Sequence, residues 1–429
     1  MKAIISICAE TNEVTIRLQE LDWAAVERQS LYEGELTVQE VVRVTGQELT
    51  ARLLQQQVVT APQIEVAEQI YYRKAASVGH YQTLYGPRAI ERPLYQTSAG
   101  GATICPLEQK CHLQFGAATP LLAEVISFKL ASATAREVAA DLGKSHALHL
   151  SPSYLQSVAQ AVGTHAVAQR RDGEVALAEP AVPVTTIATG VDGTTVPLVG
   201  EGYKEAMCGT LALYEKGGER LTTEYHGALP QAGKTAFAQS FAARVQQVVA
   251  QFPQALHVCL GDGAKWNWEF FRQHFPAALW ILDFYHASTH LHDVAVLLFG
   301  VGAQAQAYYE EWRGQLLEEF GAVMGLVRSL CRYRKKLALS TQVRAAVTRE
   351  INYFRSHQER MQYAVYRWAG LPIGSGVTEA GCKELIKARF CRSGMRWKRA
   401  SGAPLLQLRA IKLSQQWDGF WANVMLGAT

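Results

Sequence analysis

Two acidic residues end neighbouring apolar runs of the sequence, at positions where their carboxylates could act on a ligand. Residues 258–260 form a short apolar run that stops at Asp262, which lies between two glycines that let the chain turn sharply. Residues 279–282 form a second run, which ends at Asp283. The runs predict two buried strands joined by a helix at 266–275. Because open α/β sheets place ligands at the carboxyl ends of strands, the spacing predicts a polar site that contains Asp262 and Asp283.

A third acid, Asp192, follows a run of β-branched residues at 185–191. Between Asp192 and Asp262 the pattern predicts two further strands and a long amphipathic helix, at 206–214, 220–226 and 232–252. The predicted order is therefore strand, strand, strand, helix, strand, helix, strand. This is the order of an RNase H-like domain, which would place Asp192 on the first strand and Asp262 on the fourth.

A fourth acid, Glu379, is separated from the others by a long helical pattern. The region after residue 290 is predicted to be helical through about residue 366. A segment rich in glycine and proline at 371–376 then breaks the pattern, and a last helix begins near Val377 with Glu379 in its first turns. The expected fold class is α/β, with an RNase H-like catalytic core interrupted by an all-helical insertion. A mainly helical N-terminal region with a small β element is expected before the core.

Five segments are predicted along the chain. They are an N-terminal helical region with a small β element at 1–115, a helical segment at 116–172, the first part of the core at 184–290, the helical insertion at 291–370, and the final helix with a basic C-terminal segment at 371–429. Strands at 81–85, 89–94 and 112–115 make up the small β element. Short helices at 133–143, ending at Gly143, and from Ser151 predict either a helix-turn-helix, whose second helix would enter the DNA major groove, or an ordinary helical hairpin.

The charge distribution favours a phosphate-rich partner. The chain of 429 residues has a formal net charge of +4, but residues 328–399 hold 17 Lys or Arg against four acids. Solvated helix faces would also explain such an excess, whereas the aromatic residues among the cations favour a nucleic-acid backbone. The scattered cysteines fit a reducing cytoplasm, and neither a membrane span nor a secretory signal peptide is expected.

Five short motifs follow one another along the chain. They are Val191-Asp192-Gly193, Gly261-Asp262-Gly263-Ala264, Asp283-Phe284-Tyr285-His286, Gly374-Ser375-Gly376-Val377-Thr378-Glu379 and Ser393-Gly394-Met395-Arg396-Trp397. Together they resemble the ISKra-type transposases of bacterial insertion sequences, which belong to a Mutator-like set. The third motif has the Asp-x-x-His spacing that marks this set after the second catalytic Asp. The resemblance covers about residues 180–410.

The resemblance implies an RNase H-like core, a helical insertion before the last acid, and DNA transposition by a triad of acids. By position in the motifs, the triad would be Asp192, Asp262 and Glu379. The partners implied are double-stranded DNA, both at the element ends and at the target, and further copies of the chain on that DNA. The implied location is the bacterial cytoplasm, in association with the nucleoid.

The chemistry of phosphodiester cleavage and strand transfer fits three acids. Two Mg²⁺ ions about 3.5–4 Å apart can activate the attacking oxygen and stabilise the leaving oxygen. Mg²⁺ prefers a few carboxylate oxygens with water and phosphate completing its shell, and Mn²⁺ is expected to substitute. Asp192 would bridge both ions, while Asp262 and Glu379 would each hold one. Taken singly, the Asp-Gly pairs also fit ordinary turns and Glu379 fits a helix start, but the strand order favours catalysis.

Other polar residues near these motifs support two interpretations each. In the first interpretation, His286 contacts a scissile phosphate or orients Asp262, and Asp283 is an alternative metal ligand. In the second, Asp283 and His286 form a hydrogen-bonded structural pair. Trp397 would stack on an unpaired base or pack in the core. A cation-rich run after Glu379 predicts a DNA-binding segment, which consists of Lys383, Lys387, Arg389, Arg392, Arg396, Trp397 and Lys398.

The expected function is DNA cleavage and strand transfer by a transposase that uses water and 3'-OH nucleophiles. An RNase H-like metal-dependent nuclease and a domesticated DNA-binding protein derived from a transposase are the alternatives. The helical insertion and the basic final helix argue against the nuclease, and the intact triad argues against the domesticated protein. A phosphotransferase is disfavoured, since no phosphate-cradling glycine loop with a lysine is present.

Overall fold

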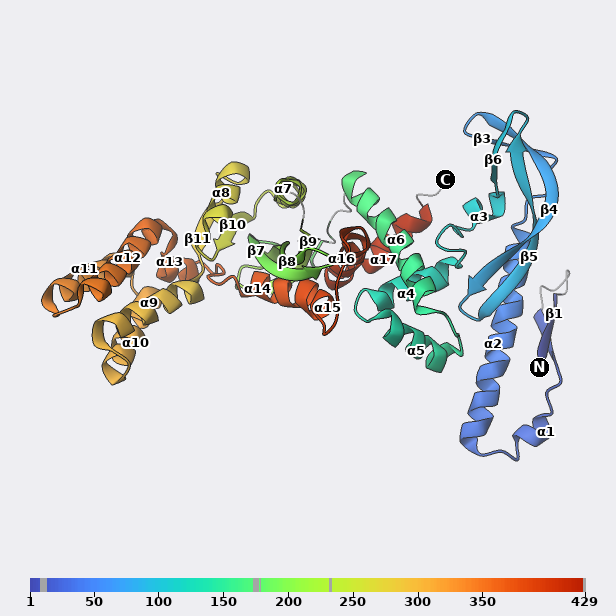
Figure 1. Ribbon diagram of the computed structural model, residues 1–429, viewed down its shortest axis with the longest axis horizontal. Helices are drawn as coiled ribbons and strands as arrows, with labels where there is room; N and C mark the ends of the chain where they lie inside the picture. The colour runs from blue at the N-terminus through green and yellow to red at the C-terminus, as the bar shows by residue number, and fades with distance from the viewer. Residues whose placement is uncertain (8–13, 173–176, 178, 231–233, 427–429) are drawn as a thin grey trace. The chain divides into compact units, whose positions relative to one another are not determined.

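The computed structural model describes residues 1–7, 14–172, 177, 179–230 and 234–426, and the fold is mixed α/β (Figure 1). The chain forms two compact units. The first holds Met1–Asp172, Gln407–Lys412 and Gln416–Thr429, and the second holds Gly173–Leu406 and Leu413–Gln415. Among the described residues, no helix is long and apolar enough to cross a membrane.

The first unit contains a four-stranded antiparallel sheet in the order β3-β4-β5-β6. Its strands are β3 (Gln63–Val66), β4 (Gln69–Thr83), β5 (Gly86–Thr97) and β6 (Gly100–Ile104). A separate antiparallel pair consists of β1 (Lys2–Ile7) and β2 (Val14–Gln19). The helices of this part are α1 (Trp23–Val26), α2 (Leu31–Gln56) and α3 (Pro106–Lys110).

The prediction for residues 1–115, a helical region with a small β element, understates the strands, which occupy most of residues 63–104. The first part of β4 is exposed on both faces, so it lacks the alternation that reveals a half-buried strand. Only its last residues bury side chains such as Tyr81 and Thr83, and this is the part that the pattern predicted. The strand expected at 112–115 is a turn, in which His112 has a φ of 51°.

Four further helices belong to the first unit, together with the helical segment Gln407–Lys412: α4 (Pro120–Leu130), α5 (Ala135–His146), α6 (Pro152–Asp172) and α17 (Trp417–Leu426). A capping box of Thr134 and Glu137 starts α5, which continues past the predicted end at Gly143. The start of α6 is confirmed, with Ser151 as its cap. Residues 147–151 connect the two helices, and a helix-turn-helix role for them stays a prediction.

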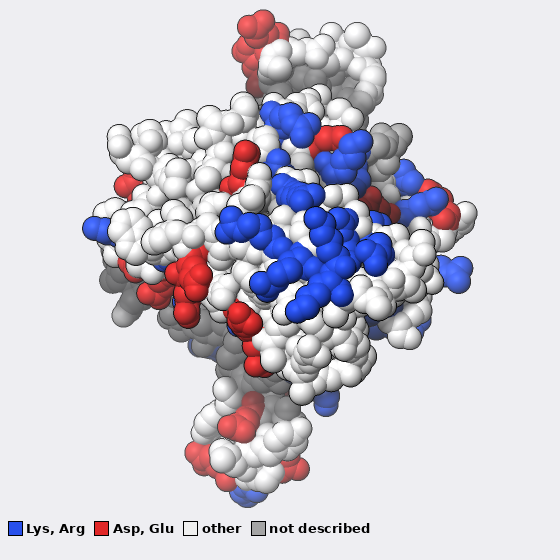
Figure 2. All heavy atoms as spheres, turned by 90° about the vertical axis from the view of Figure 1, so that its left-hand side faces the viewer, with Lys and Arg blue, Asp and Glu red and all other residues white. Residues whose placement is uncertain are grey.

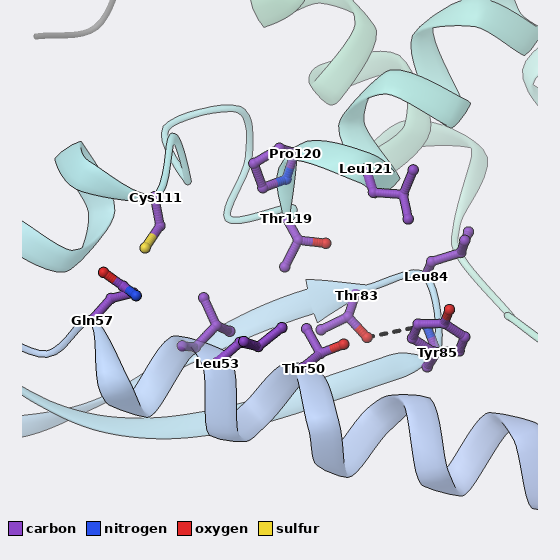
Figure 3. A pocket seen from close by; sticks show the side chains of 11 residues that line it. Thr50, Leu53, Gln57, Thr83, Leu84, Tyr85, Cys111, Thr119, Pro120 and Leu121 are labelled. Atoms are coloured by element: carbon purple, nitrogen blue, oxygen red, sulfur yellow. Dashed lines mark hydrogen bonds between the residues drawn. The ribbon is translucent and has the colours of Figure 1, made fainter. Parts of the chain in front are cut away.

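A hollow of about 350 Å³ opens in the first unit between α2, the β4–β5 turn and the start of α4 (Figure 3). Leu53, Leu54 and Leu121 make its walls largely apolar. The Thr83 hydroxyl is used internally, because it donates to Gly86 O and also accepts from a neighbouring backbone N–H. None of the described residues that line the hollow is charged, so we assign it no chemistry.

The second unit contains a five-stranded mixed sheet in the order β11-β10-β7-β8-β9. In this sheet β7, β8 and β9 are antiparallel neighbours, whereas β10 and β11 run parallel to β7. The elements are β7 (Thr186–Leu198), β8 (Gly202–Tyr214), β9 (Arg220–Ala228), α7 (Thr235–Gln251), β10 (Leu256–Gly261), α8 (Lys265–His274) and β11 (Leu279–Leu282). The predicted order of three strands, helix, strand, helix, strand is confirmed.

Helices pack on both faces of this sheet. Gly209 of β8 faces α7, since a Cβ added to it would lie 2.7 Å from a ring of that helix. Thr210 faces the opposite side, where its hydroxyl lies 2.6 Å from that of Thr378 in α14 (Gly376–Gly381). Gly190 of β7 pairs with Thr210, and side chains on a strand alternate between faces. Gly190 and Asp192 therefore both face α14.

A group of helices separates β11 from α14 in the chain (Figure 1). They are α9 (Phe284–Phe299), α10 (Ala303–Glu318), α11 (Ala322–Lys336), α12 (Thr341–His357), a 3₁₀ turn at Gln358–Arg360 and α13 (Tyr363–Trp368). This helical stretch begins directly after Asp283, earlier than the predicted residue 291. After α14 come a π-helical segment (Cys382–Lys387), α15 (Ala388–Phe390) and α16 (Arg399–Leu413). Short π-helical turns are frequent at functional sites.

Candidate active site

Asp192 lies within β7, although the sequence predicts it at a strand end. The strand continues because β7 pairs with β8 along its whole length, but β10 pairs with β7 only as far as Gly190. Oδ1 of Asp192 accepts a hydrogen bond from Gly193 N at 2.6 Å, and Oδ2 accepts one from Cys382 Sγ at 3.4 Å. The neighbouring Cys208 thiol, burial and the Asp192 carboxylate raise the pKa of Cys382, which keeps it a neutral donor. This contact ties β7 to the π-helical segment.

Asp262 follows β10 and lies alongside Asp192, since the parallel pairing of β10 with β7 runs to two residues before each acid. Asn267 in α8 holds the two strands together: its Nδ2 donates to Asp262 Oδ1 at 2.9 Å and to Val191 O at 3.1 Å. Ala264 N also donates to Oδ1, at 2.9 Å, whereas Oδ2 has no hydrogen-bond partner among the described residues. Sequence reasoning missed Asn267, whose only signal is its place in the first turn of α8.

Asp283 connects three elements by backbone contacts. The side chain is 1% exposed, and its Oδ1 accepts from His286 N at 2.5 Å as the N-cap of α9. Its Oδ2 accepts from Ser375 N, just before α14. The next backbone N–H, of Phe284, donates to Ile373 O at 2.8 Å. With both oxygens occupied by backbone donors, Asp283 fits a structural role better than a ligand role.

Glu379 lies in the first turn of α14, on the sheet face that carries Asp192. The helix approaches β7 so closely that a Cβ on Gly190 would overlap the hydroxyl of Thr378. Glu379 precedes Cys382 by three residues, which places the two on one side of the helix, and Cys382 contacts Asp192. The Glu379 side chain is exposed, and its carboxylate makes no hydrogen bond or ion pair with the residues that the structure describes.

The three acids of the expected triad are thus gathered around β7 without forming a closed ligand cage. Within the described ranges, no group of three or more His, Cys, Asp or Glu side chains is placed to hold a metal ion. The donor chemistry nevertheless fits Mg²⁺. This ion is commonly bound by one or two carboxylates, with water and substrate phosphate completing the shell. Asp192 on β7 and Asp262 directly after the adjacent β10 supply two carboxylates, and Glu379 is exposed on α14, which packs against β7.

His286 contacts other residues than Asp262. Its ring packs edge-on against that of His290 at 5.3 Å. His290 Nδ1 lies 2.8 Å from Glu350 Oε2, and its ring stacks on Tyr353 of α12 at 3.8 Å. The expected orientation of Asp262 by His286 is therefore absent from the described contacts, and Asn267 has that position instead.

Tyr353 brings the helical insertion against the Asp262 loop. A Cβ on Gly263 would lie 3.6 Å from its hydroxyl, and this buried hydroxyl has no hydrogen-bond partner among the described residues. Burial, followed by the nearby carboxylates of Glu350, Asp262 and Asp283, raises the pKa of Tyr353. Sequence spacing gave no signal for this group, because Tyr353 and Asp262 are brought together only by the packing of α12.

The predicted DNA-binding segment is only partly available to a ligand. Arg389 is 4% exposed, its Nη1 lies 3.6 Å from Met395 Sδ, and its guanidinium lies over the Trp397 ring at 5.1 Å. Trp397 Nε1 donates to Phe390 O at 3.0 Å, so one edge of this half-buried ring is used within the protein. Burial therefore removes Arg389 from the expected DNA contacts, and the stacking of Trp397 on a base stays a prediction. The exposed members are Lys383, Lys387, Arg392, Arg396 and Lys398.

Comparison with known proteins adds no assignment to this site. No protein-family model matches the sequence, and no curated protein matches it significantly.

Proposed function

We propose that this chain is a DDE transposase that cuts and joins the DNA of a bacterial insertion sequence. The observation that carries the proposal is the placement of Asp192 on β7 and of Asp262 directly after the adjacent parallel strand β10, with the helix of Glu379 packed on β7 at Gly190. The strand order β11-β10-β7-β8-β9, with three antiparallel strands followed by two parallel ones, supports an RNase H-like core. The helical stretch between β11 and α14 supports the expected insertion before the last acid.

In this proposal Asp192, Asp262 and Glu379 would hold two Mg²⁺ ions. When bound, such ions lower the pKa of an attacking water or 3'-OH and stabilise the leaving oxygen. The protein's part is to keep the carboxylates oriented. Asn267 fixes one oxygen of Asp262 and leaves the other for a cation, and Asp283 holds the loop before α14 so that Glu379 stays near β7.

The proposal extends to the partners and the setting of the reaction. The substrates would be double-stranded element ends and target DNA, in the cytoplasm of a bacterium. Two ends must be processed together, so a dimer or larger assembly on DNA is expected. Light scattering of the complex tests this, and one chain bound to two ends would contradict it.

The test is cleavage and joining on a plasmid that carries the gene with its flanking DNA. Asp192→Asn, Asp262→Asn and Glu379→Gln should each abolish both products and retain DNA binding, while Asp293→Asn, at an exposed acid of α9, should leave both products unchanged. Mg²⁺ or Mn²⁺ should support the reaction, and Ca²⁺ should bind without supporting it. Near-normal cleavage by a triad variant would remove that residue from the site.

A metal-dependent nuclease on the same core is the second candidate, supported by the same acids. Joined products separate the two functions, because a nuclease would cut the plasmid and never connect a 3' end to new DNA. Binding without any cleavage in Mg²⁺ would favour the domesticated DNA-binding protein.

A further inference from the structure

The hairpin of α11 and α12 concentrates the positive charge of the chain. Residues 322–357 contain eight Lys or Arg and a single acid, Glu350, which lies 2.8 Å from His290. The hairpin thus carries a formal charge of +7, whereas the whole chain carries +4, so the rest of the chain is net negative by three. The eight cations are Arg328, Arg332, Arg334, Lys335, Lys336, Arg344, Arg349 and Arg355.

None of the eight cations of the hairpin forms an ion pair with a carboxylate of the described residues. Three of them bond neutral groups across the seam of the two helices: Arg334 Nη1 to Thr348 Oγ at 2.9 Å, Arg344 Nη1 to Arg334 O at 3.0 Å, and Arg355 Nη2 to Cys331 Sγ at 3.3 Å. These bonds hold guanidinium groups of both helices along the seam. Because the partner groups are neutral, the positive charge of the arginines is not compensated by them.

An exposed stripe of cations runs along α11. Arg328, Arg332 and Lys335 are spaced by four and three residues, which places them on one side of the helix, and all three are exposed. The other side of α11 is buried through residues such as Val323 and Leu330. Figure 2 shows Lys and Arg side chains gathered in one continuous patch on the face where these insertion helices lie.

We infer that the α11–α12 hairpin is a docking surface for the phosphate backbone of duplex DNA, an inference that rests on the proposed function. From Arg328 to Lys335, the two ends of the stripe, the helix rises about 10.5 Å, since each residue adds about 1.5 Å. Phosphates of one DNA strand follow at about 3.4 Å along the axis, so the stripe matches three to four of them. Six of the eight cations are arginines, whose planar donors suit phosphate oxygens.

The position of α12 connects this surface to the candidate active site. One side of α12 carries Tyr353, which packs against the Gly263 position of the Asp262 loop, while another carries Arg344 and Arg355. A helix is about 10–12 Å across with its side chains, so DNA bound to the Arg344 and Arg355 side of α12 would lie about one helix diameter from the Asp262 loop.

A nucleic acid fits the hairpin better than an anionic membrane surface. Membrane-surface helices combine basic side chains with a large exposed apolar face. Met324 is the sole large apolar side chain that the described part of the hairpin exposes. The basic C-terminal segment is the weaker surface, because Arg389 is buried there and Arg399 is paired with Glu201.

The test measures the salt dependence of binding to a random-sequence duplex by fluorescence anisotropy. The variant changes Arg328, Arg332 and Lys335 to Ala, which is the best helix former, so α11 should persist. If each cation neutralises one phosphate, the slope of log K against log salt should fall by about 2.7. Wild type should then lose about 40-fold more affinity than the variant between about 50 and 200 mM salt. Circular dichroism checks that both proteins are folded.

A matched control removes the same charge elsewhere in the second unit. It changes Lys204, Lys216 and Arg220, which are exposed on β8, on the β8–β9 connection and at the start of β9, to Ala. The control should keep the wild-type slope.

The outcomes separate this inference from the proposed function. Equal slopes for wild type and the α11 variant would overturn the hairpin as the DNA surface and leave the transposase proposal standing. Wild type without salt-dependent DNA binding would contradict the transposase proposal itself. A variant that lost binding to phosphatidylserine vesicles but kept its DNA slope would show that the hairpin serves a membrane and would overturn the inference.

Discussion

Removing the Asp283 carboxylate should destabilise the second unit even in the absence of metal. Asp283→Ala deletes the N-cap of α9, which typically contributes about 1 kcal/mol. It also leaves the Ser375 N–H buried without its acceptor, at a cost of about 1–3 kcal/mol. The free energy of unfolding should therefore fall by about 2–4 kcal/mol.

Urea unfolding followed by tryptophan fluorescence measures this change, because Trp280 lies in β11 next to Asp283. Asp293→Ala is the control: Asp293 is exposed on the same helix, so its loss should change stability by less than about 0.5 kcal/mol. Asp283→Asn should recover only part of the lost stability. Its amide offers one acceptor oxygen, whereas the backbone N–H groups of His286 and Ser375 each need an acceptor.

The reasoning would be refuted by an Asp283→Ala protein of wild-type stability in EDTA that has lost its stabilisation by Mg²⁺. A ligand that binds only the folded state raises its stability, so that result would make Asp283 a metal ligand and not a connector.

Two further predictions follow from close contacts and from burial. Gly190→Ala should destabilise the second unit and lower cleavage, because the new Cβ overlaps the Thr378 hydroxyl; the added change Thr378→Ala should restore part of the stability, and a double variant no better than the single one would contradict this. Burial lowers the pKa of His257 to about 4, and burial followed by Arg360 lowers that of His357 to about 4. Since an unfolded histidine takes up its proton near pH 6.5, stability should be full above that pH and decline down to about pH 4, by up to about 1.4 kcal/mol per pH unit for His257. Urea titrations across this pH range test it, and a His257→Gln protein with the same acid sensitivity would contradict it.

The element order of the second unit could be predicted because each signal was local. Buried strands such as β10 and β11 are short apolar runs, and the turn after β10 is marked by Asp262 between glycines. Once the strands were placed, parallel pairing implied that the acids at their ends would be neighbours, and Asp262 does lie alongside Asp192. Only part of the N-terminal sheet was predicted, at 81–85 and 89–94, because much of β4 is exposed on both faces and carries no period.

Roles that depend on burial or on distant partners could not be predicted. Arg389 reads as one cation in a basic run, but packing against Trp397 buries it. From the sequence, Asp283 fits a metal ligand or a structural pair with His286 equally well, and the decision comes from Ser375, which is 92 residues away in sequence. The same holds for Tyr353, which meets the Asp262 loop only through the packing of α12.

The sequence by itself determined which acids are available, on which elements they lie and where positive charge is concentrated, since these depend on local periodicity and composition. Tertiary structure alone decided which oxygens are already occupied and which cations face solvent. Hydrogen bonds and burial depend on contacts between segments far apart in the chain. Asp262 keeps an oxygen without a partner among the described residues while Asp283 keeps none, and neither fact is visible in the residues that flank them.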